Sequence, residues 1–141
     1  MPSLLELDAR FMQYEVTIAD QCHGRKLPDG TTQWGGFEVD TFIKVDTLTD
    51  AHGLWFDCPK CYTAWKAGSE HGPHAVLVWF EGSPVPDHIG KNKDGKTVRW
   101  KVAGGTGLSD LILTPSIQLQ GGGCEWHGFV GSGGVPPGYA Q

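Results

Sequence analysis

Apolar and polar residues alternate along two long stretches of the chain. Within residues 11–18, the even-numbered side chains from Met12 to Ile18 would share one face of a strand. Residues 37–45 alternate in the same way and predict the clearest half-buried strand of the protein. A short helix over Leu4–Phe11 is the alternative for the beginning of the first stretch.

Shorter apolar segments predict further strands. The run AVLVWF at residues 75–80 is continuously apolar, which favours a buried central strand. Glycine, proline and aspartate mark residues 20–35 as loop and turn, and residues 81–96 as the longest loop. We expect one antiparallel sheet that contains residues 54–56, 75–80, 98–102 and 111–114.

The composition agrees with a strand-rich fold. The chain has 141 residues, which suits one domain, and its 21 Gly and 9 Pro disfavour long helices. The fold class predicted is therefore mainly β, a small antiparallel sheet domain with short or no helices. Residues 1–130 would form the domain, and the Gly/Pro-rich residues 131–141 a C-terminal tail with little structure of its own.

Charge and hydropathy exclude some classes of function. The formal net charge is −5, so bulk charge does not favour binding to phosphate backbones. No run of about 18 apolar residues predicts a membrane span. The first residues lack the basic and apolar regions of a secretory signal, so we expect a protein of the reducing cytoplasm.

Four potential metal ligands occur in two short motifs. The first is CPKC, from Cys58 to Cys61, and the second is CEWH, from Cys124 to His127. In each, the spacing lets both side chains of a tight turn reach one ion at about 2.0–2.3 Å. Three thiolates and one imidazole favour Zn²⁺, with iron the next candidate. The sequence therefore predicts a zinc site formed by Cys58, Cys61, Cys124 and His127 that staples the sheet domain.

Two other interpretations of the cysteines stay open. They are cysteines packed as small hydrophobic residues and a thioredoxin-like redox pair, although the redox pair lacks its usual βαβ context. If zinc is bound, four protein ligands leave no position for water or substrate, so a structural metal is expected and no catalytic residue is assigned. His74, Asp57 and Glu125 are candidates for hydrogen bonding to the ligands or for an alternative site, with His74 more simply explained as a loop residue before a strand.

A basic segment provides one further candidate. Five of the eleven Lys and Arg residues lie between positions 91 and 101, and Trp100 lies among them. Such a segment can contact nucleic acid by neutralising phosphates and stacking on bases, although a solvated loop that leads into a strand is the simpler explanation. The residues concerned are Lys91, Lys93, Lys96, Arg99 and Lys101.

Several segments carry a family resemblance. They are GRKLPDGTTQWGGFEVDTF, CPKC, HAVLVWFEGSPVPDHIG and GTGLSDLILTPSIQLQ, with the last followed by CEWHGFV. Together they resemble a group of small phage and prophage proteins that often carry the automatic label "ammonia monooxygenase". The resemblance extends from about Gly24 to Pro137, and its most specific part is TPSI followed by Cys-x-Trp-His-Gly-Phe. A copper or membrane oxygenase needs His-rich copper ligands and membrane helices, and the sequence has neither, so no oxygenase activity is expected.

These observations favour one function over two alternatives. The favoured function is a small zinc-stabilised accessory or binding protein of phage origin, whose partner is another protein or a second copy of itself. The first alternative is a metal-dependent hydrolase in which one zinc position is open to water. The second is a nucleic-acid binder that uses residues 91–101.

Overall fold

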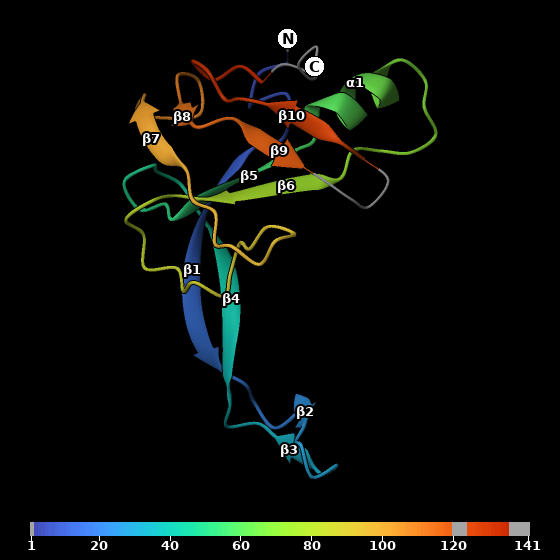
Figure 1. The fold of residues 1–141 in the computed structure, drawn as a ribbon, viewed down its shortest axis with the longest axis vertical. Helices are drawn as coiled ribbons and strands as arrows, with labels where there is room; N and C mark the ends of the chain where they lie inside the picture. Colours follow the sequence, from blue (N-terminus) through green and yellow to red (C-terminus); the bar gives the residue numbers. More distant parts are fainter. Residues whose placement is uncertain (1, 120–123, 136–141) are drawn as a thin grey trace.

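The computed structural model describes residues 2–119 and 124–135, which form a body and a long projecting arm (Figure 1). The arm consists of β1 (Arg10–Ile18) and β4 (Glu38–Val45), with the small hairpin of β2 (Gly24–Lys26) and β3 (Thr32–Trp34) at its tip. The other elements form the body: β5 (Gly53–Asp57), α1 (Pro59–Lys66), β6 (Ala75–Trp79), β7 (Lys101–Gly104), β8 (Ile112–Thr114), β9 (Ile117–Leu119) and β10 (Trp126–Gly128). The fold is mainly β with antiparallel sheets, as the sequence predicts.

One antiparallel sheet with the strand order β4-β1-β5-β6 joins the arm to the body. β1 pairs with β4 from Phe11 to its end at Ile18, but with β5 only up to Met12. β1 therefore leaves the body with β4 as its remaining strand partner. Both alternating stretches of the sequence are confirmed as strands. The helix considered over Leu4–Phe11 is replaced by turns at residues 4–8, followed by β1.

The sheet predicted for the body divides into separate parts. β5 and β6 pair with each other as expected. The other two predicted strands are represented by β7 and β8, which form a two-stranded sheet of their own with a register shift between Val102 and Gly104. A single parallel bridge between Phe80 and Trp100 connects the two sheets. The expectation of one sheet is thus corrected, because β6 and β7 share only this bridge and no continuous ladder.

The core lies between the β5–β6 layer and the strands of the C-terminal half. Leu54 and Phe56 of β5 alternate with residues on the opposite face and are fully buried. Phe56 meets Trp126 of β10 edge to face, with the ring centroids 6.1 Å apart. Burying each of these large side chains contributes about 1.5–3 kcal/mol to folding, so this contact binds β10 firmly to the central layer.

Residues 131–135 belong to the predicted tail, yet their backbone bonds to the body and Val135 is part of this core. Val135 is fully buried, and its N–H donates to the carbonyl of Pro2 over 2.9 Å. Gly133 accepts from the N–H of Leu4 and donates to the carbonyl of Leu111. A Cβ at Gly133 would lie 2.4 Å from the Ser109 carbonyl oxygen, so this close approach requires glycine. The remainder of the predicted tail, residues 136–141, lies outside the described residues.

A polar contact links the arm to the long loop of residues 80–98. The Asp40 carboxylate accepts a hydrogen bond from the Tyr14 hydroxyl (2.6 Å) and contacts Nε2 of His88 on that loop (2.8 Å). The hydrogen bond to Asp40 is the main reason that the pKa of Tyr14 rises from 10.0 to about 12. The same bond, followed by the contact with His88, lowers the pKa of Asp40.

The Tyr14–Asp40 bond can be tested by pH. Because the raised pKa favours the protonated phenol in the folded state, the stability from this bond is complete below pH 10 and is lost as the pH rises through about 12. We expect Asp40→Asn to move the pKa of Tyr14 back toward 10.0. The tyrosinate absorbance band would be followed against pH, with Tyr14→Phe identifying the transition. An unchanged transition in Asp40→Asn would contradict this explanation.

Candidate metal centre

The CPKC motif lies where a strand becomes a helix. β5 ends at Asp57, Cys58 is the N-cap of α1, and Pro59 follows at the first helical position, where its missing N–H is not needed. Cys61 is three residues after Cys58, and side chains at this spacing share one face of a helix. The two sulfurs therefore converge at the beginning of a helix, instead of in the tight turn that the spacing of the motif predicts.

Cys124 reaches the same place from the C-terminal half of the chain. It stands two residues before β10, which pairs with β9 in an antiparallel ladder. The ammonium group of Lys60, in the first turn of α1, donates to the carbonyl of Glu125 over 2.9 Å. Together with the Phe56–Trp126 contact, this bond holds the Cys124 segment against the start of the helix.

His74 is brought to the cysteines by the register of β5 and β6. The two strands pair Phe56 with Val76 and Asp57 with Ala75. The pairing continues by one residue beyond the strands, because the N–H of Cys58 donates to the carbonyl of His74 over 2.8 Å. His74 thus lies directly across from Cys58, although sixteen positions separate them along the chain.

These four residues form one group of potential ligands. The Sγ atom of Cys124 lies 3.5 Å from that of Cys61 and 3.9 Å from that of Cys58. With a ring nitrogen of His74 included, all four ligand atoms lie within 4.8 Å of one another. Ligand atoms of a tetrahedral zinc site with bonds of about 2.0–2.3 Å are themselves about 3.3–3.8 Å apart. The sulfurs are too far apart for a disulfide, and the four cysteines of the chain are free thiols. The group can hold a metal ion.

His127, assigned by the sequence analysis as the fourth ligand, is outside this group. Its Nε2 instead lies 2.8 Å from the Ser116 hydroxyl. The physical reason is backbone geometry. Residues 126–128 are an extended strand in which successive side chains point to opposite faces, so His127 faces away from the side occupied by buried Trp126. The CEWH spacing brings two ligands together only in a tight turn, and here only Cys124 joins the group.

Burial and the mutual proximity of the thiols govern their protonation. Burial is the main cause that raises the pKa of Cys58 to about 12, and the neighbouring thiols of Cys124 and Cys61 act in the same direction. The backbone N–H groups of Cys61 and Lys60 oppose this rise. Burial also raises the pKa of Cys124. Three thiolates this close repel each other, and a divalent cation between them removes that repulsion and deprotonates coordinating thiols.

The two acidic candidates, Asp57 and Glu125, have backbone groups that take part in hydrogen bonds of the fold. Asp57 ends β5, where its N–H donates to the carbonyl of Leu7, and burial followed by the Asp8 carboxylate raises its pKa. The side chain of Glu125 is exposed, while its carbonyl receives the Lys60 bond. Neither carboxylate belongs to the group of potential metal ligands found among the described residues.

The residues of the basic segment have two kinds of surroundings. The Arg99 guanidinium donates to the carbonyls of Ile89 and Pro86, so it closes the base of the long loop. The Trp100 indole N–H donates to the carbonyl of Ser116. The remaining cations are exposed, three on the loop and one on β7: Lys91, Lys93, Lys96 and Lys101.

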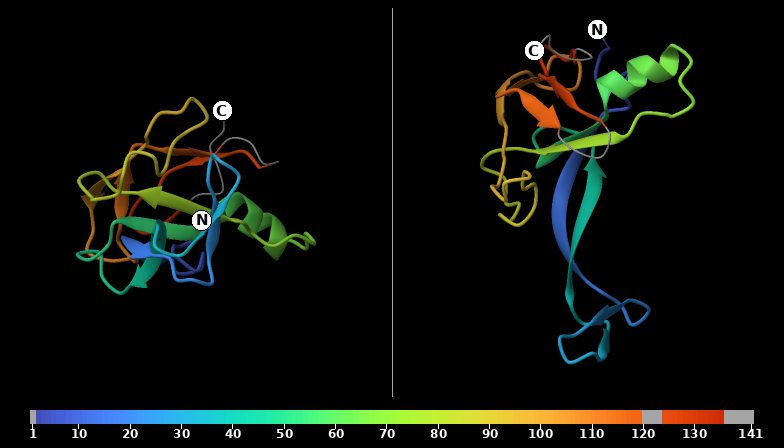
Figure 2. Two further views of the ribbon diagram at one scale, coloured as in Figure 1. Left: turned by 90° about the horizontal axis from the view of Figure 1, so that it is seen from below. Right: turned by 45° about the vertical axis from the view of Figure 1, so that its right-hand side comes forward.

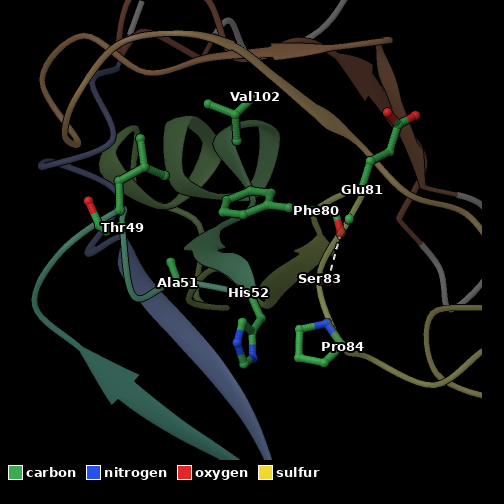
Figure 3. A pocket seen from close by; sticks show the side chains of 10 residues that line it. Thr49, Ala51, His52, Phe80, Glu81, Ser83, Pro84 and Val102 are labelled. Atoms are coloured by element: carbon green, nitrogen blue, oxygen red, sulfur yellow. Dashed lines mark hydrogen bonds between the residues drawn. The ribbon is translucent and has the colours of Figure 1, made fainter.

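An open cleft of about 450 Å³ lies elsewhere on the body, between residues 48–52 and 80–84 with Val102 beside them (Figure 3). It contains both a histidine and a serine. His52 accepts a hydrogen bond from the Tyr14 N–H at Nδ1, and the Ser83 hydroxyl donates to the carbonyl of Phe80. Both groups are used to hold the backbone, and they form no nucleophile–base pair with each other.

No helix among the described residues is long and apolar enough to cross a membrane. Comparisons of the chain with protein-family models, with curated proteins and with solved structures gave no match. The candidate site is therefore interpreted from its own geometry.

Proposed function

We propose that this protein is a zinc-stabilised accessory protein of phage origin that acts in the host cytoplasm by binding another protein, and not by catalysis. The single observation that supports the proposal most is the set of three thiols and one imidazole whose ligand atoms lie within 4.8 Å of one another. The phage origin rests on the resemblance of the TPSI…CEWHGF segments described above.

Zinc is the metal that this donor set favours. Three sulfur ligands and one nitrogen ligand in a tetrahedral arrangement suit Zn²⁺, since this ion has no geometric preference from its d electrons and accepts both donor types. The ligands would be Cys58, Cys61, His74 and Cys124. They come from the start of α1, the start of β6 and the segment before β10, so one ion would join three distant parts of the chain.

A structural role for the ion follows from the same set. Four protein ligands fill a tetrahedral shell, whereas catalytic zinc sites keep one position for water or substrate. A hydrolase would require one of the four ligands to release the metal and a base to stand beside it. A role in nucleic-acid binding has less support, because Trp100 and one of the five cations of the basic segment, Arg99, already donate to backbone carbonyls.

Metal analysis of the purified protein tests the proposal. We expect one zinc per chain by elemental analysis, and expect Co²⁺ in its place to give the intense visible bands of a tetrahedral thiolate complex. A protein without stoichiometric metal would contradict the proposal. Cobalt spectra typical of five or six ligands, combined with hydrolysis of model esters or phosphoesters that depends on the metal, would favour the hydrolase instead.

A further inference from the structure

The outer edge of β4 is an unpaired strand edge that runs along the arm. β4 is the end strand in the order β4-β1-β5-β6. The right-hand view of Figure 2 shows the arm leaving the body, and no further strand of the described residues lies beside it there. Three large apolar side chains on this strand are substantially exposed: Val39 (37%), Phe42 (41%) and Ile43 (37%). A two-stranded ribbon is marginally stable alone in water, so this edge is suited to pairing with another strand.

The directions of the backbone groups follow from the contacts of β1. The Tyr14 N–H donates to Nδ1 of His52, and the Met12 carbonyl accepts from the His52 N–H. The backbone N–H and C=O groups of the even-numbered residues of β1 therefore point away from β4. Phe42 and Lys44 lie opposite Tyr14 and Met12. In an antiparallel pair, the backbone N–H and C=O groups of these two partners point away from β1, toward the outer edge of β4. By the same alternation, the outward-facing backbone groups of β4 belong to Glu38, Asp40, Phe42 and Lys44.

Two copies of β4 match each other when they pair antiparallel about a two-fold axis at Thr41. In this register Glu38 of each copy lies opposite Lys44 of the other, Val39 lies opposite Ile43, and Asp40 lies opposite Phe42. Opposite charges and apolar side chains directly across from each other stabilise an antiparallel pair. All four outward-facing residues then pair with outward-facing residues, as the hydrogen-bond ladder requires.

Neighbouring registers lose the Glu38–Lys44 pairs. A shift of the centre to Asp40 places the two Asp40 carboxylates opposite each other. A shift to Phe42 places Asp40 opposite Lys44, but it moves Glu38 opposite Asp46, one residue past the end of β4. A slip by one residue brings outward-facing backbone groups against inward-facing ones. Of these three registers, the one centred at Thr41 pairs Glu38 with Lys44 and leaves no like charges opposite each other, and charge reversal at Glu38 distinguishes it from the register centred at Phe42.

We propose that the β4 edge is a docking surface for a second copy of this chain, forming a two-fold symmetric dimer with a continuous β1-β4-β4-β1 sheet. The charge complementarity of Glu38 and Lys44 across the axis carries the proposal, and the exposed Val39 and Ile43 are the apolar side chains that the dimer brings together. Self-pairing of this kind is isologous and closes after two copies. The proposal extends the binding role proposed above, and it does not depend on the identity of the metal.

Charge reversal tests the register. By sedimentation equilibrium, we expect wild type to dimerise, and Glu38→Lys and Lys44→Glu each to weaken the dimer at least about tenfold by creating two like-charge pairs. Mixing the two single variants should restore dimers, because every pair is then complementary. The double variant Glu38→Lys/Lys44→Glu should also dimerise. Far-UV circular dichroism and zinc content, unchanged in all variants, would show that the body is intact.

A cross-link tests the position of the axis. In a Cys22→Ser background, Thr41→Cys should form a disulfide dimer under mild oxidation, since the two residues would face each other at the axis. Glu38→Cys, whose partner is Lys44, should not. A wild-type protein that stays monomeric at all concentrations, or a dimer insensitive to Glu38→Lys and to mixing, would overturn the proposal. One zinc per monomer in that case would leave the proposed function standing, so the two failures are distinguishable.

Discussion

Cys58→Ser is expected to lose its bound zinc and much of its folded body. Cys58 is fully buried, is the N-cap residue of α1, and its sulfur contacts that of Cys124. Because ligands from three segments meet only in the folded chain, the free energy of metal binding contributes directly to folding. Loss of a structural metal belongs to the mutations that cost more than about 4 kcal/mol. For a domain of this size, that lowers the unfolding midpoint by about 10 °C or more.

Cys22→Ser is the matched control for this experiment. Cys22 is exposed on the arm and is the one cysteine outside the group of potential ligands. Thermal unfolding followed by circular dichroism, with and without a zinc chelator, would compare the two variants with wild type. We expect the chelator to destabilise wild type and Cys22→Ser equally, and to have little further effect on Cys58→Ser. If Cys58→Ser kept its zinc and its unfolding midpoint, the proposed centre would be refuted.

His74→Ala is expected to weaken zinc binding at least about a hundredfold, whereas His127→Ala should leave it unchanged. Mutation of groups that merely hydrogen-bond to metal ligands already costs 10–100-fold in affinity, and a direct ligand contributes more. His127 instead lies beside the Ser116 hydroxyl, on the face of β10 opposite to the core. Competition with a chromophoric zinc chelator would measure both affinities.

A replacement ligand adds a further control to the histidine experiment. His74→Cys should recover much of the lost affinity, because four thiolates also form a closed tetrahedral zinc site. In the Co²⁺ protein it should also strengthen the sulfur-to-metal charge-transfer band. The reverse ranking, with His127→Ala weakening binding and His74→Ala not, would return the fourth ligand to the CEWH motif.

The strands of the arm show what a local pattern of apolar and polar residues can predict. Alternation over residues 11–18 and 37–45 predicts strands, because a strand with one face covered repeats every two residues. Yet β1 pairs with β5 only up to Met12 and with β4 alone beyond it, and several of the apolar residues in the pattern remain exposed, among them Ile18 at 64%. Alternation predicts the type of element but carries no information about whether another layer covers it.

The predicted tail differs in the opposite direction, because its described part, residues 131–135, is more buried than its composition predicts. Gly and Pro content predicts little regular structure in residues 131–141, and residues 131–135 indeed form no long strand. Their backbone nevertheless bonds to Pro2, Leu4 and Leu111, and Val135 is fully buried. Composition predicts the absence of regular structure, whereas burial depends on segments more than a hundred residues earlier in the chain.

The sequence by itself determined the mainly β character of the protein, its two long strands and three of its four potential metal ligands. Side-chain period and the chemistry of cysteine are local properties, so they can be predicted from neighbouring residues. Only the tertiary structure decided that the fourth position belongs to His74. That residue reaches Cys58 through the β5–β6 register, and a register is set by the packing of two whole strands. The extended backbone at residues 126–128 turned His127 away for the same reason, because pairing with β9 left no tight turn in which the CEWH spacing could bring both ligands together.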